Sequence, residues 1–587
     1  MKLHTLLSFA LALAPLCTNA QDTPSPANIP THTGQYEIHP DFSLTLVADD
    51  SLVHDPVDLQ FDETGRAFVV EMGGYPFASD DPEEYPGKIV ILEDTNRDNV
   101  FDTRTVFADH LQYANSILPH RGGILVAAPP DILFLQDTNG DQRADLRKTL
   151  VSGFSVGNAQ HNVNGLIHGL DNWIYAGNGG NSGTLFWPDH PNQTTPVRNR
   201  DIKFNFETRQ IEFLGPTTTG FSVAIDNWGR VFTTHNLKHV NHLPIPYRYT
   251  ELNPYLTPPS NPDISDHKTG ELDRGYSIGK QESRLNHPEQ SGYFSCSCGI
   301  TFYGGGAFPK EFDNALFVAD SVLNIIHHDQ LQPDGPVFRA SRTRNKVEFL
   351  ATSDRHSRPV NLRVGPDGAL YVVDMYRAVI EHPEWIPDEL EKDMDLFAGS
   401  DQGRIYRVTP KTGLPKADPR FDRDNLPAVV SYLEHPNRWF RDTAQRLLVW
   451  WQDPRSIPLL QNLATHSTSP LARVHALWTL HALINPESGQ PTLGALTDSL
   501  LTRALQDPHP GVRENALQIA ERSLATCPAL LQQTLLLAND PDPRVRMQTA
   551  LSLGLLLNSS GQPASPPLLP ALMTILQPAL QQTWSRH

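Results

Sequence analysis

Cysteine, positive charge and long apolar stretches are scarce in this chain of 587 residues. Besides Cys17, near the amino terminus, it has only Cys296, Cys298 and Cys527, which cannot supply a general disulfide framework. The pair Cys296 and Cys298 forms either a strained bridge or two small buried thiols. The formal net charge of −19 argues against nucleic acid or an anionic membrane surface as a partner. Beyond the first twenty residues no apolar run could span a bilayer, so we expect no transmembrane helix.

The first twenty residues have the pattern of a cleaved secretory signal. Lys2 precedes the apolar run LLSFALALAPL, and Thr-Asn-Ala stands directly before Gln21. We therefore expect cleavage after Ala20 and a secreted or periplasmic protein. A lipid anchor on Cys17 is not expected, because Leu16 stands where a lipoprotein signal needs a small residue.

One short pattern occurs six times between Asp58 and Asp374: an apolar stretch, a tight turn, a second apolar stretch and a polar residue. The two clearest copies are PVDLQFDETGRAFVVEM and PVNLRVGPDGALYVVDM. One anchor residue per turn gives Gly65, Gly123, Asn172, Gly229, Asn314 and Gly368. Each interval suits a propeller blade of about four strands. The pattern predicts an all-β six-bladed β-propeller over residues 51–408, after an amino-terminal extension at 21–50, with an insertion in blade four.

Polar residues are expected at one mouth of the central channel. In each hairpin, the residues before the first strand and after the second lie at the same end, opposite the turn. The residues before the first strands are His54, Asp55, Gln112, Tyr113, His161, Asn162, Thr218, Thr219, Tyr303, Gly304, Ser357 and Arg358, and those after the second strands are Glu71, Pro129, Asn178, His235, Asp320 and Asp374. Their His, Arg and carboxylate content favours a functional site, although water-facing strand ends of a purely structural propeller are also polar.

From Asn425 the apolar periodicity becomes helical. Four similar segments carry Arg441, Arg473, Arg513 and Arg546, and an Ala- and Leu-rich stretch follows the arginine. This pattern is typical of stacked helix pairs of the HEAT type. We therefore predict a linker at 409–424, an all-α HEAT-repeat solenoid at 425–580 and a short tail at 581–587. Such a solenoid either binds a protein partner or braces the neighbouring propeller.

Two Asp-rich loops, DTNRDNVFD and DTNGDQRAD, place side-chain oxygens at alternate positions, as calcium loops do. The candidate ligands are Asp94, Asn96, Asp98 and Asp102 in the first loop and Asp137, Asn139, Asp141 and Asp145 in the second. Neither loop has Gly at its sixth position or Glu at its twelfth. The alternatives are structural Ca²⁺ on outer hairpins and plain Asx-turns, in which the side chains bond their own backbone.

His161 is the sharpest catalytic candidate, because it opens the segment HNVNGLIHGLDNWIYAGNGG at the predicted mouth. A neutral imidazole is suited to take a proton from an alcohol as hydride leaves. Arg358, at the equivalent place in blade six, has a planar guanidinium that suits a carboxylate or a quinone oxygen. Asp374 and Arg377 close the blade-six motif, and they either belong to the site or pair with each other across a turn.

The segment that begins at His161 resembles the active-site segment of the soluble aldose and sorbosone dehydrogenases that use pyrroloquinoline quinone (PQQ). The resemblance implies that His161 is the general base and that Gln112 and Arg358 contact the quinone. It also implies a sugar or polysaccharide-derived alcohol as substrate. With the other mouth residues, the expected cofactor-binding set is Gln112, Asn162, Asn178, His235, Arg358 and Arg377, and the expected catalytic set is His161, Arg358 and Asp374.

A closer resemblance covers nearly all of the chain after residue 20. The stretches PPDILFLQDTNGDQRAD, SGYFSCSCGITFY and SPLARVHALWTL are similar to those of the PVC-type membrane-bound dehydrogenase family, in which HEAT repeats follow such a propeller. Two departures matter. Thr218 and Thr219 stand where the aldose dehydrogenases have an Arg-Asn pair that binds the quinone and its metal. Many family members carry a c-type haem domain, but Cys-x-x-Cys-His is absent here, so we expect no covalent haem and a separate electron acceptor such as a cytochrome c.

Two other functions fit the same sequence. A metal-dependent hydrolase such as a lactonase would use Glu71, Asn178, Asp320 and Asp374 to hold a divalent ion at the mouth. A non-catalytic platform for polysaccharide or protein would use aromatic side chains such as Trp187, Trp385 and Tyr376. Fold alone does not choose among the three functions.

Overall fold

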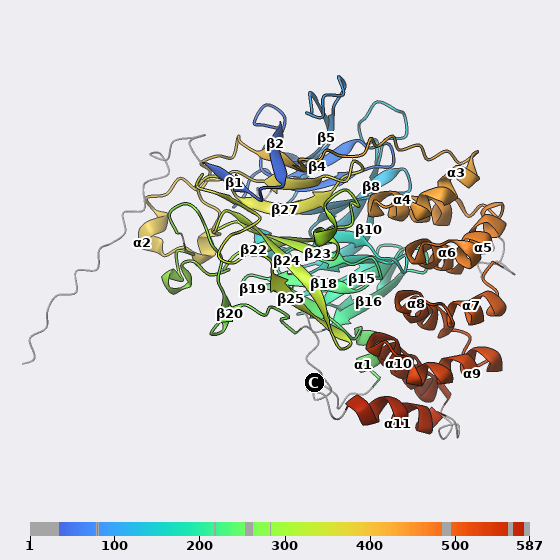
Figure 1. The fold of residues 1–587 in the computed structure, drawn as a ribbon. Coiled ribbons are helices and arrows are strands. Elements are labelled where there is room, and N and C mark those ends of the chain that lie inside the picture. The colour runs from blue at the N-terminus through green and yellow to red at the C-terminus, as the bar shows by residue number, and fades with distance from the viewer. Residues whose placement is uncertain are drawn as a thin grey trace, which may run out of the picture.

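The computed structural model describes residues 35–579 except 78, 80, 216–218, 253–261, 282, 484–494 and 561–567. The predicted signal sequence, Thr218 and the predicted tail lie outside the described residues. Six antiparallel sheets form blades around an axis, and the helices that follow them stack along one side (Figure 1). The predicted six-bladed β-propeller with carboxyl-terminal helices is thus confirmed, whereas the HEAT type of those helices stays a prediction.

The first three blades follow the order of the sequence. Blade one contains β3 (Pro56–Phe61), β4 (Ala67–Glu71), β5 (Gly87–Glu93) and β6 (Thr103–Leu111). Blade two contains β7 (Ser116–His120), β8 (Gly123–Ala128), β9 (Asp131–Gln136) and β10 (Leu146–Phe154), extended at its edge by β13 (Gly183–Trp187) and β14 (His190–Pro196). Blade three contains β11 (Asn164–His168), β12 (Ile174–Gly177), β15 (Asp201–Asn205) and β16 (Gln210–Gly215).

The last three blades complete the circle. Blade four contains β17 (Val223–Ile225), β18 (Val231–His235) and β19 (Lys238–Leu243), followed by an insertion with α1 (Tyr247–Thr250), β20 (Lys268–Thr269) and β21 (Leu272–Asp273). Blade five contains β22 (Ser297–Phe302), β23 (Ala315–Asp320) and β24 (Ile325–Asp334), with β25 (Val337–Arg342) and β26 (Leu350–Thr352) paired to β24. Blade six contains β27 (Pro359–Val364), β28 (Leu370–Asp374) and β29 (Arg404–Pro410), and α2 (Asp388–Glu391) lies before β29.

The amino-terminal segment closes the ring. β1 (Tyr36–Ile38) pairs with β26 of blade five, and β2 (Phe42–Ala48) pairs with β29 of blade six. Residues 36–48 therefore belong to the propeller and not to an extension, which corrects the predicted boundary at residue 51. The physical reason is that the outer edge of blade six would otherwise present unpaired backbone groups.

Hydrogen bonds between first strands hold the blades together around the axis. The buried carboxylate of Asp58, in blade one, accepts from Asn361 Nδ2 of blade six at 3.0 Å and from Ser116 Oγ of blade two at 2.7 Å. Ser116 Oγ in turn accepts from Leu166 N–H of blade three at 3.0 Å. Arg363 of blade six also pairs with Asp58 at 2.8 Å.

The same chain of contacts continues through the other blades. Asn164 Oδ1 of blade three accepts from Ser222 N–H at the start of blade four at 2.7 Å. Thr234 Oγ1 of blade four donates to Cys298 O of blade five at 3.0 Å, and the Cys298 thiol donates to Pro359 O of blade six at 3.4 Å. We call this closed set of contacts the axial ring. Gly299 allows the close approach, because a Cβ there would lie 2.5 Å from the Cα of Asn361.

Blade five departs from the predicted spacing. The anchors fall in the turns between first and second strands, but in blade five this connection runs from β22 to β23 and is long. Tyr303 and Gly304, predicted at the mouth, consequently lie at the turn end, where Gly304 O accepts from Arg438 N–H at 2.7 Å. Ser295 and Cys296, directly before β22, take their place at the mouth.

The carboxyl-terminal helices form a stack beside the propeller (Figure 1). They are α3 (Leu426–Ser431), α4 (Arg438–Trp451), α5 (Ser456–His466), α6 (Pro470–Ala482), α7 (Asp498–Ala504), α8 (Pro510–Ala520), α9 (Pro528–Leu536), α10 (Pro543–Ser560) and α11 (Leu568–Ala579). One apolar core runs through α3 to α10, and α11 packs in a second cluster. None of the described helices is long and apolar enough to cross a membrane.

The repeated arginines have one shared role. Each of Arg441, Arg473, Arg513 and Arg546 donates through Nη1 to the carbonyl oxygen of the residue six positions before it. Arg473 also pairs with Asp507, and Arg513 with Asp540, through two bonds of 2.7 Å each. Arg473 and Arg513 therefore link their helices to the segment that follows.

The helical stack packs on the end of the propeller where the anchor turns lie. Gln445 donates to Leu170 O at 2.9 Å, and Asn172 donates to Trp478 O at 3.1 Å. Trp228 stacks on His509 with ring centroids 4.4 Å apart. The predicted mouth of the central channel is at the opposite end of the propeller, so these helices leave it uncovered.

A buried ion pair at this interface generates a prediction. Arg230 pairs with both Asp226 and Glu514, and breaking such a pair leaves unpaired buried carboxylates at a cost of about 3–5 kcal/mol. Arg230→Met should lower the free energy of unfolding by about that amount in urea denaturation. Arg121→Met is the matched control, because the Arg121–Glu207 pair is exposed and should cost less than about 1 kcal/mol. Equal losses of unfolding free energy in both variants would contradict a buried ion pair at this interface.

Candidate functional site

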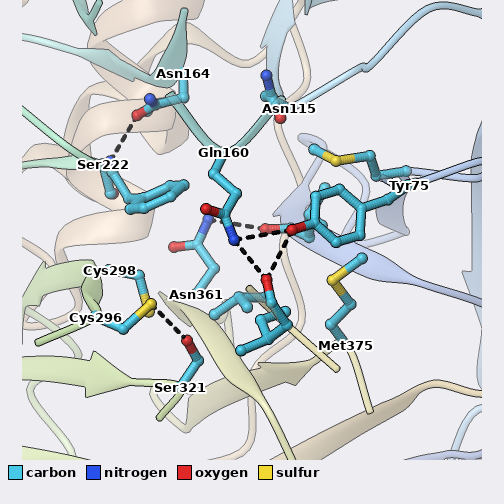
Figure 2. A pocket seen from close by; sticks show the side chains of 16 residues that line it. Tyr75, Asn115, Gln160, Asn164, Ser222, Cys296, Cys298, Ser321, Asn361 and Met375 are labelled. Carbon is cyan, nitrogen blue, oxygen red and sulfur yellow. Dashed lines mark hydrogen bonds between the residues drawn. The ribbon is translucent and has the colours of Figure 1, made fainter. Parts of the chain in front are cut away.

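A cavity of about 70 Å³ lies on the propeller axis (Figure 2). Its wall receives at least one residue from the inner side of every blade: Val57, Asn115, Asn164, Ser222, Cys298 and Asn361. Because several of these residues also form the axial ring, the same contacts that close the propeller shape the cavity. Met72, Met375 and Phe221 make the lining mostly apolar.

Tyr75 and Gln160 form a polar pair in the cavity wall, as Figure 2 shows. Gln160 Nε2 donates to Tyr75 Oη at 3.0 Å and to Ile380 O at 2.6 Å, and Tyr75 Oη–H donates to the same carbonyl at 2.7 Å. Burial raises the pKa of Tyr75 well above its usual value. The phenol therefore stays neutral and keeps the loop that carries Ile380 against the cavity.

His161 lies beside the cavity, although it does not line it. Its ring is 5.7 Å, centroid to centroid, from Phe221, which is part of the wall. Burial, followed by the nearby charges of His235, Arg284 and His382, lowers the pKa of His161 to about 4. The imidazole is thus neutral at neutral pH, which is the form that accepts a proton.

Charged and polar groups gather near His161 at the mouth. Arg284, from the blade-four insertion, pairs with Glu381 at 3.0 Å. Burial lowers the pKa of His235, followed by the charges of Lys238 and Arg284. His235 and His161, in adjacent blades, were both predicted at this mouth, and Arg284 was not.

The two arginines predicted to hold a quinone are occupied within the protein. Arg358 is buried and donates to three backbone carbonyls, those of Ser321, Arg377 and Ala378, at 3.0 Å each. Arg377 is fully buried and pairs through two bonds with Asp55, at 2.5 and 2.6 Å, and not with Asp374. Both guanidinium groups therefore brace loops, and neither lines the cavity.

Most other predicted cofactor contacts are also structural. Asn162 is buried and accepts from Gly157 N–H at 3.2 Å. Asn178 Nδ2 donates to the carbonyl oxygens of Asn181 and Val197. Thr219 binds the carboxylate of buried Asp201. Gln112 is half-buried, and Asn115, three residues later, lines the cavity in its place.

Glu71, Asp320 and Asp374 do not form the predicted metal site. Their oxygens accept from the backbone of the segment before each first strand: Glu71 from His54 N–H, Asp320 from Cys296 N–H, and Asp374 from Arg358 N–H. Burial raises the pKa of Asp374 to about 6. Within the described chain, these carboxylates belong to no group of His, Cys, Asp or Glu close enough to share an ion.

The Asp-rich loops use their side chains as Asx-turns. Asp94 accepts from Asp98 N–H and Asn99 N–H, and Asp102 accepts from Thr95. In the second loop, Asp137 accepts from Gln142 N–H at 2.8 Å, and Asn139, Asp141 and Asp145 make similar bonds. These bonds explain the loops without an ion, so calcium there stays a prediction.

The cysteines and aromatic candidates also have defined places. Cys296 and Cys298 are free thiols in the cavity wall, where Cys298 is buried and Cys296 is half-buried. Trp187 and Tyr376 are buried and unsuited to stacking on a glycan, whereas Trp385 is 42% exposed.

Comparisons with solved structures give low similarity over the propeller. The PQQ domain of pyranose dehydrogenase from Coprinopsis cinerea is 14% identical, with a TM-score of 0.37, and the match covers 65% of this chain and 98% of that one. The PQQ-bound aldose sugar dehydrogenase of Streptomyces coelicolor is 12% identical (TM-score 0.34; 63% and 100% covered). An auxiliary nutrient binding protein of Bacteroides ovatus is 12% identical (TM-score 0.35; 64% and 78% covered). These likenesses assign no activity to this chain.

No curated protein matches the sequence. A family model does match, over residues 31–412, which is more than half of the chain and includes every blade. The chain therefore belongs to the family described as "Domain of unknown function (DUF7133)".

Proposed function

We propose that the axial funnel is the active site of a dehydrogenase that oxidises a hydroxyl group of a small, largely uncharged alcohol or sugar. The observation that carries this proposal is the neutral imidazole of His161 beside the cavity. A mostly apolar wall with a few amide groups suits a neutral molecule better than an anion.

The chemistry needs one base and one acceptor. The hydroxyl proton passes to His161, and the adjacent C–H bond breaks as hydride, with its electron pair, leaves for a diffusible two-electron acceptor such as a soluble quinone. The alcohol becomes an aldehyde or ketone, and the acceptor is reduced. The Arg284–Glu381 pair at the mouth would orient the other hydroxyl groups of a sugar.

A resident PQQ is not part of this proposal, because the residues present do not fit it. PQQ carries three carboxylates, yet Arg358 and Arg377 are committed to backbone carbonyls and to Asp55, and Thr219 to Asp201. The cavity is lined mainly by apolar side chains. Secretion of the chain and a separate protein that reoxidises the acceptor are further parts of the proposal.

The helical stack braces the propeller in this proposal. Its contacts with Leu170, Asn172 and Trp228 fix the turn end of blades three and four. The mouth residues His161 and His235 belong to the same two blades. The stack would thus support these two blades from the opposite end of the propeller. The outer face of the stack would remain available to a protein partner.

Replacing His161 tests its proposed role as the general base. His161→Gln should reduce substrate-dependent dye reduction by about 10²–10⁴-fold in an assay over a panel of sugars and alcohols. His190→Gln, an exposed histidine on β14, is the control and should retain full activity. Unchanged turnover in His161→Gln, or no turnover of the whole panel by the unaltered protein, would contradict the proposal.

The pH dependence gives a second test. Because the pKa of His161 is lowered to about 4, its base form persists down to that pH. kcat/KM should therefore be flat from about pH 5 to neutrality and fall only as the pH drops through about 4, since protonation removes the base. An acid limb near the ordinary histidine pKa of about 6.5 would assign the base to another residue.

A titration with PQQ tests the conclusion that the residues present do not fit this cofactor. Mixing the protein with PQQ and Ca²⁺ should give no saturable thermal shift and no quinone absorption that survives desalting, because neither arginine is free to bind its carboxylates. Tight binding of one equivalent would overturn this view of the cavity and return PQQ to the mechanism.

A further inference from the structure

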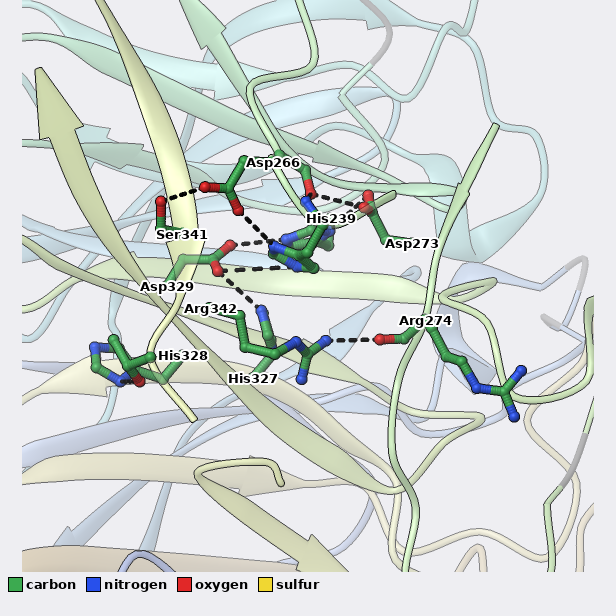
Figure 3. A network of polar contacts seen from close by, with 12 residues as sticks. His239, Asp266, Asp273, Arg274, His327, His328, Asp329, Ser341 and Arg342 are labelled. Carbon is green, nitrogen blue, oxygen red and sulfur yellow. Dashed lines mark hydrogen bonds and ion pairs between the residues drawn. The ribbon is translucent and has the colours of Figure 1, made fainter. Parts of the chain in front are cut away.

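A second group of polar side chains lies between blades four and five, away from the axial cavity (Figure 3). His239 is on β19 of blade four, His267 precedes β20 in the insertion, and His327 and Asp329 are on β24 of blade five. Their nearest ligand atoms all lie within 4.8 Å of one another. Three segments that are distant in sequence therefore bring three imidazoles and one carboxylate to a single point.

The Nε2 atoms of the three histidines converge on the Asp329 carboxylate. The distances are 2.8 Å from His239 to Oδ2, 3.1 Å from His327 to Oδ1, and 3.9 Å from His267 to Oδ1. In a tetrahedral site with bonds of about 2.0–2.2 Å, ligand atoms are separated by roughly 3.4 Å. The observed distances lie on both sides of that value.

The other ring nitrogen of each histidine faces an outer carboxylate. His239 Nδ1 is 3.0 Å from Asp273, and His327 Nδ1 is 2.6 Å from Glu348. His267 Nδ1 is 3.3 Å from Asp266. When an Nδ1–H donates to a carboxylate, Nε2 presents its lone pair, which is the arrangement by which proteins orient histidine ligands around a metal.

A proton-free Nε2 that faces a carboxylate is unfavourable unless a cation lies between them. His267 Nε2 is buried and makes no hydrogen bond within the described part of the chain. Asp266, Asp273, Asp329 and Glu348 surround the three rings, and Arg342 offsets one of these charges at 2.7 Å from Glu348. A divalent ion at this point would be bound by the ring nitrogens and would offset the excess of negative charge.

We propose that His239, His267, His327 and Asp329 bind one divalent transition-metal ion of the zinc type. Imidazole ligands favour such a metal over Ca²⁺ or Mg²⁺, which prefer all-oxygen sites. The side chains of His239, Asp329 and His327 are at most 1% exposed, and that of His267 is 14% exposed. Four protein ligands in a closed pocket are typical of a structural site, not a catalytic one.

The site has a structural task in the propeller. The described part of blade four has only three strands, and the insertion that follows forms one isolated bridge with it, Asn241–Asp263, and one with blade five, Ser265–Ala340. A metal held by β19, the insertion and β24 would lock these segments to each other. The same insertion leads on to Arg284 at the mouth of the funnel.

Metal analysis of the full-length protein without a polyhistidine tag tests the proposal. The purified protein should contain about one equivalent of zinc or a related metal, and after chelator treatment it should take up one equivalent of Co²⁺ with the intense visible bands of four-coordinate cobalt. Removal of the metal should lower the Tm, and Zn²⁺ should restore it. A protein that binds neither ion stoichiometrically, with the same Tm before and after chelation, would overturn the site.

Two variants assign the ligands. Asp329→Asn should weaken metal binding by at least about 100-fold, because it removes the only anionic ligand. His328→Gln is the matched control: His328 is a buried histidine on the same strand, but its ring stacks on Phe312 and Phe317. It should keep one equivalent of metal. Equal loss of metal from both variants would contradict the ligand set, and if Asp329→Asn does not fold, the cobalt titration of the unaltered protein decides.

Discussion

The buried carboxylate of Asp58 is the contact on which the rest of the propeller depends. It joins blades six, one and two directly, and through Ser116 it reaches blade three. Burial raises the pKa of Asp58, and the positive charge of Arg363 opposes this shift. A carboxylate in such a position is stable only with several donors around it. The axial ring thus fixes the first strands, and these strands form the wall of the cavity.

The two ends of the propeller have different tasks. At the turn end, Asn172 and Trp228 meet the helices, and the arginine links carry that support from one helix pair to the next. At the other end, a 3-10 turn before β11 brings His161 to the mouth, and the end of β18 brings His235 there. The proposed metal between blades four and five would hold the insertion that carries Arg284 beside them. The supporting contacts therefore lie behind the site, and the connecting segments lie around it.

The sequence predicted the blades because tight turns need special residues. Gly65, Asn172 and Gly368 all have positive φ, which Gly and Asn adopt most easily, so the turns were visible in the pattern. The ring closure by residues 36–48 was not predictable, since β1 and β2 pair with strands more than 300 residues away along the chain. The long connection in blade five likewise shifted the predicted mouth residues there.

Site residues were harder to predict, because local sequence does not show what occupies a side chain. Arg377 was predicted to bind a cofactor, yet it pairs with Asp55, which is 322 residues away. His239, His267 and Asp329 have no short spacing that marks a metal site. The one local signal was the His-x-Asp spacing of His327 and Asp329, which places both side chains on the same face of a strand.

The most direct test of the role of the axial ring is amide hydrogen exchange in Asp58→Asn, with exposed Asp41→Asn as control. Faster exchange in β3, β7 and β27 of Asp58→Asn alone is the predicted result, and unchanged protection of these strands would contradict the role of the axial ring.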